Sequence, residues 1–134
     1  MPKLPLPPRL DAFLAKPNAS VIATLRRDGS PVTVATWYVW EGGRVLVNMD
    51  EGRKRLAHLR ADPRVSLTVM DITDWSAHVS LQGRVVSIEE DVGLRDIDRI
   101  AMHYMGEPYY ERGRRRYSAW IEVDTWHAWR PERM

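Results

Sequence analysis

The 134-residue sequence contains no cysteine and only one phenylalanine. Without cysteine the chain has no disulfide, no thiolate metal site and no cysteine nucleophile. No apolar run approaches the roughly 20 residues needed to span a bilayer, and the proline-rich start lacks the apolar stretch of a secretory signal. These absences predict a cytoplasmic protein that does not insert into a membrane.

Motifs of several enzyme classes are also missing. The sequence has neither the glycine-rich dinucleotide pattern nor the P-loop, and it lacks the Gly-x-Ser-x-Gly nucleophile motif. Its four histidines form no His-x-x-x-His pair, so we expect no metal site. The acidic residues suggest no general acid and base pair, so no catalytic residue is assigned.

An excess of one charge is lacking as well. The chain has 20 basic and 18 acidic residues, and this balance argues against a nucleic-acid partner. Its length predicts a single domain over residues 1–134, with residues 1–8 as an extended N-terminal arm because of their prolines. Tryptophan and tyrosine are abundant, with six and five copies, and both are favoured where proteins meet ligands.

Hydrophobic periodicity predicts a mainly β chain with short helices. The first three strands are expected to form an antiparallel meander through tight turns at Asp28-Gly29 and Gly42-Gly43, and Gly83 predicts a bulge. Six short antiparallel strands must shield their edges, which favours a closed or partly closed barrel; an open α+β sheet is the alternative. The expected strands are 20–25, 31–40, 44–49, 64–71, 77–89 and 117–129, and the expected helices are 9–16, 51–61 and 90–105.

One predicted helix starts with an unusual charge pattern. Its first residues are Arg53, Lys54 and Arg55, although the start of a helix attracts negative charge. The backbone N–H groups there bind anions, and arginine binds them in a bidentate way, so the segment predicts a phosphate or polycarboxylate site. A solvated basic patch is the alternative. A second basic run, residues 112–116, is expected either in a solvated loop or as an extension of the same electropositive groove.

Short motifs follow one another in a characteristic order along nearly the whole chain, from about Val21. They are Ala23-Thr24-Leu25, Asp28-Gly29-Ser30-Pro31, Trp37-Tyr38, Val47-Asn48, Gly52-Arg53-Lys54-Arg55, Leu59-Arg60-Ala61-Asp62-Pro63-Arg64-Val65-Ser66, Val79-Ser80-Leu81-Gln82-Gly83-Arg84-Val85 and Tyr104-Met105-Gly106-Glu107. This order resembles the flavin/deazaflavin split-barrel oxidoreductases, the superfamily of pyridoxamine 5′-phosphate oxidase. Within it, the chain looks most similar to the small actinobacterial branch that uses coenzyme F420.

The resemblance implies a six-stranded antiparallel split β-barrel of the FMN-binding type. It also implies a homodimer with two cofactor sites between its subunits. The ring system of the cofactor would lie along the second and third strands, the basic helix start would hold its anionic tail, and the partner's segment from Trp75 to His78 would complete the pocket. The implied cofactor-binding residues are Thr33, Val34, Ala35, Thr36, Trp37, Asn48, Met49, Asp50, Arg53, Lys54, Arg55, Trp75 and His78.

The function implied is that of an F420-dependent oxidoreductase, which transfers a hydride between the deazaflavin and a small unsaturated or carbonyl substrate. Tyr38 or water would donate a proton. Relatives have lysine four residues before the leucine that matches Leu59, where this chain has Arg55. The alternatives are an FMN-binding relative of pyridoxamine 5′-phosphate oxidase and a non-catalytic module that binds F420 or nucleic acid.

Overall fold

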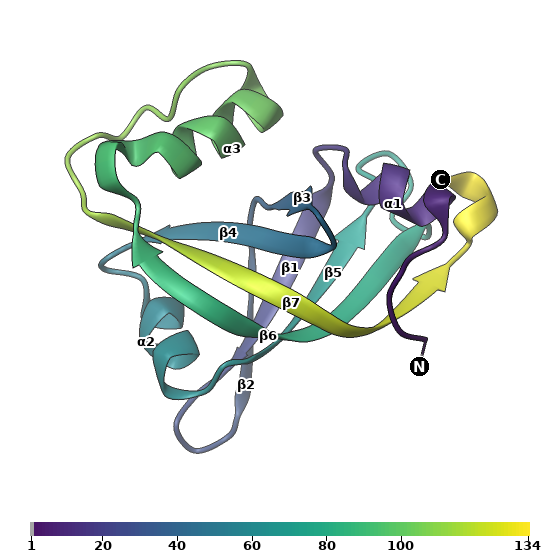
Figure 1. The fold of residues 1–134 in the computed structure, drawn as a ribbon, viewed down its shortest axis with the longest axis horizontal. Helices are drawn as coiled ribbons and strands as arrows, with labels where there is room; N and C mark the ends of the chain where they lie inside the picture. Colours follow the sequence, from purple (N-terminus) through teal and green to yellow (C-terminus); the bar gives the residue numbers. More distant parts are fainter. Residues whose placement is uncertain (1) are drawn as a thin grey trace.

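The computed structural model describes residues 2–134, and within them seven strands form one antiparallel sheet (Figure 1). The order across the sheet is β2-β1-β5-β6-β7-β4-β3. The elements are α1 (Pro8–Leu14), β1 (Ala19–Leu25), β2 (Pro31–Ala35), β3 (Val39–Glu41), β4 (Arg44–Asp50), α2 (Lys54–Ala61), β5 (Arg64–Met70), β6 (His78–Glu90), α3 (Arg95–Met105) and β7 (Arg116–Trp129), with short 3₁₀ turns at Val92–Leu94 and Pro131–Arg133.

The sheet has one strand more than expected because the predicted strand 31–40 is two strands, β2 and β3. They lie at opposite edges of the sheet, where β2 pairs with β1 and β3 pairs with β4. The expected three-stranded meander is therefore wrong, and β4 pairs instead with β7. Between β2 and β3 the chain passes through Tyr38, whose ring is fully buried and whose hydroxyl donates to the carbonyl of Leu14 at 2.7 Å. This short connection joins the two edges and curls the sheet, which confirms the mainly β split-barrel architecture.

The hydrophobic core lies inside the curled sheet. Alternate residues of β1 and β5 point into it, as a two-residue period requires. Helix α1 closes one end of the barrel with Leu10, Phe13 and Leu14, all buried. Each such side chain contributes about 1.5–3 kcal/mol through burial. The C-terminal turn lies beside α1, while α2 and α3 lie at the other end of the molecule (Figure 1).

Strands β6 and β7 are long and bend around the barrel. The register between them shifts at Gln82/Gly83, so the bulge expected at Gly83 is confirmed. A Cβ atom on Gly83 would meet the Glu122 carbonyl oxygen, so no side chain fits there. In the predicted N-terminal arm, the carbonyls of Pro2 and Lys3 accept hydrogen bonds from the backbone and indole N–H of Trp126 on β7. Residue 1 of that arm lies outside the described residues.

Both later helices begin further along the chain than expected. The Asp50 carbonyl and carboxylate hold a turn through the N–H groups of Arg53 and Gly52, and α2 starts only after it. The buried carboxylate of Asp91 accepts the N–H groups of Asp96 and Ile97, both at 2.9 Å, which fixes the start of α3. No helix in residues 2–134 has the length and hydropathy of a membrane span.

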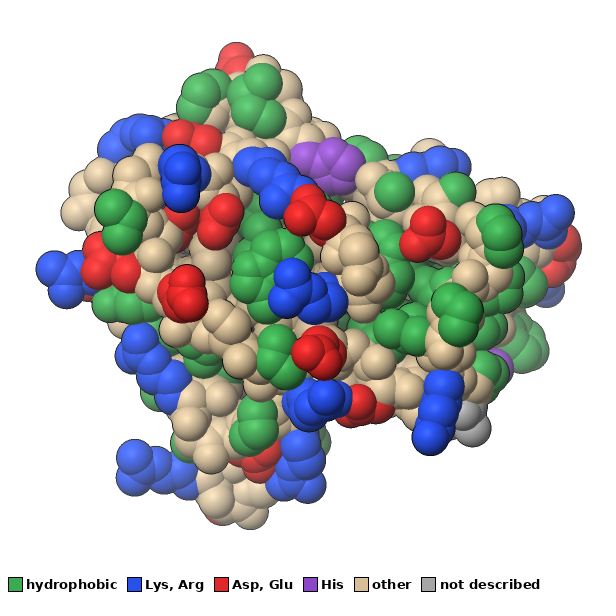
Figure 2. All heavy atoms as spheres, viewed as in Figure 1, with side chains coloured by type: hydrophobic (Ala, Val, Ile, Leu, Met, Phe, Trp, Pro, Cys, Tyr) green, Lys and Arg blue, Asp and Glu red, His purple; other side chains and the backbone are tan. Residues whose placement is uncertain are grey.

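On the face seen in Figure 2, acidic and basic side chains are interspersed, with hydrophobic side chains between them. This mixture agrees with the small net charge of +2. The face shows no extended surface of one sign.

Candidate functional site

A central cleft of about 550 Å³ lies between α3 and the segment that joins β2 to β3. It is lined by residues 34–37 and, from α3, by Ile97, Ile100 and Tyr104. Its surface is largely apolar, but Arg53, Arg55 and Arg116 also border it. The remaining lining residues are Asn18, Ala19, Ser20, Asn48, Ile72, Met105, Tyr109 and Tyr110.

Aromatic side chains shape the central cleft. The rings of Trp37 and Tyr104 are stacked with their centroids 5.2 Å apart, and Tyr109 meets Trp37 edge-on at 6.2 Å. The Tyr104 hydroxyl donates to the Asn18 carbonyl at 2.8 Å. Burial raises the pKa of Tyr104 to about 12, so this hydroxyl keeps its proton at neutral pH.

A second hollow, the α2 groove, lies beside the central cleft at the start of α2. It has a volume of about 240 Å³. Four of its lining residues are cationic and none is acidic. Its histidine is held in place, because His58 Nδ1 lies 3.1 Å from the buried hydroxyl of Thr24. The α2 groove is lined by Thr24, Arg26, Val32, Thr33, Val34, Arg53, Lys54, Arg55 and His58.

Arg55 borders both the α2 groove and the central cleft. Its Nη2 donates to the Asn48 carbonyl at 3.3 Å, but within residues 2–134 its buried Nε has no hydrogen-bond partner. Burial lowers the pKa of Arg55, and the charges of Arg53 and Arg116 lower it further. A bound anion would relieve this repulsion and satisfy the unpaired N–H group.

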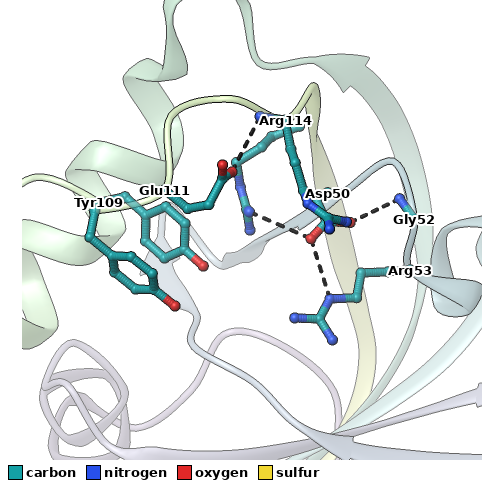
Figure 3. A pocket seen from close by; sticks show the side chains of 8 residues that line it. Asp50, Gly52, Arg53, Tyr109, Glu111 and Arg114 are labelled. Atoms are coloured by element: carbon teal, nitrogen blue, oxygen red, sulfur yellow. Dashed lines mark hydrogen bonds and ion pairs between the residues drawn. The ribbon is translucent and has the colours of Figure 1, made fainter.

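A third hollow, the Arg114 groove, lies on the other side of Arg53 (Figure 3). Its volume is about 360 Å³. One carboxylate, that of Asp50, faces Arg53 Nε at 3.6 Å and Arg114 Nη1 at 3.7 Å, while accepting the Gly52 N–H at 2.8 Å. The Arg114 groove is lined by Asp50, Gly52, Arg53, Tyr109, Tyr110, Glu111, Arg114 and Arg116.

Arg116 is buried and firmly oriented. Its Nε donates to Asn48 Oδ1 at 2.8 Å, and its guanidinium lies 4.6 Å above the centre of the Tyr109 ring. The Asn48 amide nitrogen in turn donates to Asp91 and to Ser118, both at 3.1 Å. Asn48 is thereby fixed between β7 and the start of α3, and it holds Arg116 toward the central cleft.

The loop between α3 and β7 carries the tyrosines and Arg114, and it is fastened to α3 by Asp98. The Asp98 carboxylate accepts from both terminal nitrogens of Arg112, at 2.6 and 3.1 Å, and from the Tyr109 N–H at 3.0 Å. The Arg112 guanidinium lowers the pKa of Asp98. Burial raises the pKa of Tyr109, which therefore stays neutral beside the arginines.

The structure brings most of the sequence-predicted site residues to these three hollows. Val34, Ala35, Thr36, Trp37, Asn48, Arg53 and Arg55 border the central cleft, Thr33 and Lys54 border the α2 groove, and Asp50 borders the Arg114 groove.

Other predicted residues lie elsewhere. Met49 is fully buried in the core, because β4 turns its side chain into the barrel. Tyr38, considered as a proton donor, is also buried there. Trp75 is 76% exposed in the loop before β6, and His78 begins that strand. The expectation that Trp75 and His78 complete a partner's site stays a prediction.

Several lining residues were not predicted. Arg116 opens β7 and is buried, and Arg114 borders the groove named after it, so the second basic run extends the electropositive region. The sequence signal was the run itself. For Tyr104, Tyr109 and Tyr110 the only sequence signal was the general abundance of tyrosine. Nothing in the local sequence indicates that α3 and the loop after it lie against residues 34–37.

The sequence also matches a known protein family: the model for pyridoxamine 5′-phosphate oxidase matches residues 6–130. The chain belongs to the pyridoxamine 5′-phosphate oxidase family. This family binds flavins and includes oxidoreductases. No curated protein sequence matches the chain.

Solved structures share the fold of this pyridoxamine 5′-phosphate oxidase family member. A structure named F420 reductase is 22% identical, with a TM-score of 0.81, and the match covers 91% of this chain and 98% of the other. A conserved hypothetical protein of Mycobacterium tuberculosis is 22% identical, with a TM-score of 0.75 and coverage of 98% and 90%. General stress protein 26 of Bacillus anthracis is 19% identical, with a TM-score of 0.65 and coverage of 90% and 91%.

Proposed function

We propose that the protein is an F420-dependent oxidoreductase that acts on a small unsaturated or carbonyl substrate. The observation that carries this proposal is the continuity of two unlike hollows. A largely apolar cleft with aromatic walls adjoins, through Arg53 and Arg55, a groove that has four cations and no acidic residue. A cofactor with a flat ring joined to an anionic tail matches this arrangement, with the ring in the apolar cleft and the tail in the basic groove.

The residues fit such a group. Arg55 carries a buried Nε with no partner in the described part of the chain and lies near other cations, so an anion next to it would supply a partner. Arg26, Arg53 and Lys54 would hold the tail together with Arg55, and the Thr24 hydroxyl would keep His58 oriented toward it. Residues 34–37 and Asn48 would line the ring.

When bound, the deazaflavin supplies or accepts a hydride. The chain would contribute binding, orientation and the exclusion of water. Trp37 stacked on Tyr104 forms a stiff aromatic wall, and α3 also lines the cleft with Ile97 and Ile100. The Tyr104 hydroxyl is engaged with the Asn18 carbonyl and keeps its proton, so it orients the wall and holds the start of β1.

The similarity to the structure named F420 reductase favours F420 over FMN. The family as a whole binds flavins, so FMN is the natural competitor. A direct titration separates the two. We expect the fluorescence of F420 to fall when the protein binds it, with micromolar or tighter affinity. FMN should bind at least tenfold more weakly. Micromolar binding of FMN with no binding of F420 would contradict the proposal.

We also propose that two copies of the chain form the complete site. Strand β2 is an edge strand, and Val34 and Ala35 on it are exposed although they border the central cleft. A second copy packed on this edge would cover them. Light scattering coupled to gel filtration should give the mass of two chains; a monomer at micromolar concentration would contradict this part.

A further inference from the structure

The Arg114 groove contains charged and aromatic groups that the proposed cofactor does not use. We propose that it binds the carboxylate of a planar, conjugated substrate and directs the remainder of that substrate toward the central cleft. This inference rests on the proposed function, because it assigns the substrate class of the same site.

The charge of the two grooves differs in a way that separates their ligands. The α2 groove has four cations and no acidic residue, which suits a multiply charged tail. The Arg114 groove sets Arg53, Arg114 and Arg116 against the carboxylates of Asp50 and Glu111. Counting Arg53, which also borders the α2 groove, about one positive charge is left uncompensated there, which suits a monoanion such as a single carboxylate.

The arginines of the Arg114 groove are oriented without being saturated. Asp50 lies 3.7 Å from Arg114 Nη1 and 4.0 Å from Arg116 Nη1, and both distances exceed that of a good hydrogen bond. Arg116 is held instead through Nε by Asn48 and through its face by Tyr109. The guanidinium ends of Arg114 and Arg116 therefore keep donor capacity for a carboxylate that enters the groove.

Glu111 does not compete for this place. Its carboxylate accepts the backbone N–H groups of Gly113 and Arg114, at 2.9 and 3.2 Å, and so folds the loop on itself (Figure 3). Asp50 is likewise engaged with the Gly52 N–H. Glu111 thus serves the local backbone, and Asp50 faces the arginines only at 3.6–4.0 Å, which leaves their terminal N–H groups to face the open groove.

The tyrosines give the groove its preference for flat ligands. The rings of Tyr109 and Tyr110 are 4.8 Å apart at an angle of 34°, and Tyr110 is 78% exposed at the rim. Such faces favour contact with a planar π system. Four residues, Arg53, Tyr109, Tyr110 and Arg116, border both this groove and the central cleft, so one small ligand can reach from one to the other.

Binding of trans-cinnamate and of its neutral amide, cinnamamide, tests the inference on the purified full chain by calorimetry. We expect cinnamate to bind at least tenfold more tightly than cinnamamide. Arg114→Gln should reduce cinnamate affinity about tenfold, whereas the neighbouring control Arg115→Gln, whose side chain pairs with Glu90, should leave it unchanged.

The matched experiment on the other groove uses Arg26→Gln with Arg27→Gln as its control. Arg26→Gln should weaken F420 and leave cinnamate unaffected, the reverse of Arg114→Gln. Equal affinity for cinnamate and cinnamamide, no cinnamate binding at millimolar concentration, or equal loss in Arg26→Gln and Arg114→Gln would overturn the inference. Failure of F420 to bind, with the cinnamate pattern as expected, would overturn the proposed function and leave the carboxylate site in place.

Discussion

The α2 groove and the Arg114 groove share Arg53 but are built on different principles. No acidic side chain lines the α2 groove, and among residues 2–134 the buried Nε of Arg55 has no hydrogen-bond partner. In the Arg114 groove the Asp50 carboxylate faces three arginines and offsets much of their charge. The comparison shows that neighbouring basic grooves can differ in net charge, although their arginines look alike.

The largest effect is expected from removing the cations of the α2 groove. In the triple variant Arg53→Gln/Lys54→Gln/Arg55→Gln, F420 affinity should fall about 100-fold or more, since each charge-assisted hydrogen bond contributes about 1.5–3 kcal/mol. Cinnamate should lose much less because Arg114 and Arg116 remain. Fluorescence titration measures the first and calorimetry the second.

The control for this triple variant is Arg84→Gln, which removes a cation from β6 that pairs with Glu122 and Asp124 and borders neither groove. It should leave both affinities unchanged. If the triple variant bound F420 as tightly as the unmodified chain, the assignment of the tail to the α2 groove would be wrong.

A smaller effect is expected from Asp50→Asn, which acts on the Arg114 groove. The amide oxygen can still accept the Gly52 N–H, so the turn before α2 persists, while the negative charge next to the arginines is lost. Cinnamate should bind about fivefold more tightly, equivalent to about 1 kcal/mol for a partly solvated charge at this distance. F420 affinity should change less than twofold. Weaker cinnamate binding in this variant would mean that the carboxylate is needed to place the arginines.

The smallest effect concerns the tether of the tyrosine loop. The folded state depresses the pKa of Asp98, so its ion pair stabilises the protein above about pH 4 and is lost as the pH falls through the lowered native value. Asp98→Asn should lower the Tm by about 1–3 °C at pH 7, as is typical of an exposed pair. The difference should disappear near pH 2. A difference that persists unchanged at pH 2 would show that the charge of Asp98 is not what fastens the loop.

Much of the fold can be predicted from the sequence because, in a strand with one buried face, every second side chain is buried and apolar. The split of residues 31–40 did not follow, since β-branched and aromatic residues continue through Trp37 and Tyr38 with no glycine or proline to mark a break. The break depends on the Tyr38 hydroxyl reaching Leu14 of α1, a contact between segments far apart in the chain. Long-range contacts of this kind leave no local pattern.

The site divides in the same way. The cations of residues 53–55 could be predicted because their charge is wrong for a helix start. Arg116 could be found only as part of a basic run, because its place depends on Asn48, which lies 68 positions earlier. Tyr109 reaches the central cleft only because Asp98 holds its loop to α3. The sequence thus indicated the cations of the α2 groove, while the Arg114 groove could be recognised only in the assembled barrel.

The most direct test of two separate grooves is an F420 titration in the absence and in the presence of saturating cinnamate. If the cofactor tail occupies the α2 groove and the carboxylate occupies the Arg114 groove, the F420 affinity should stay within about threefold of its value without cinnamate, since the two grooves share only Arg53 and each ligand has further cations that the other does not contact. An apparent dissociation constant for F420 that rises in proportion to the cinnamate concentration would show that both ligands compete for one anion site, and it would contradict the account.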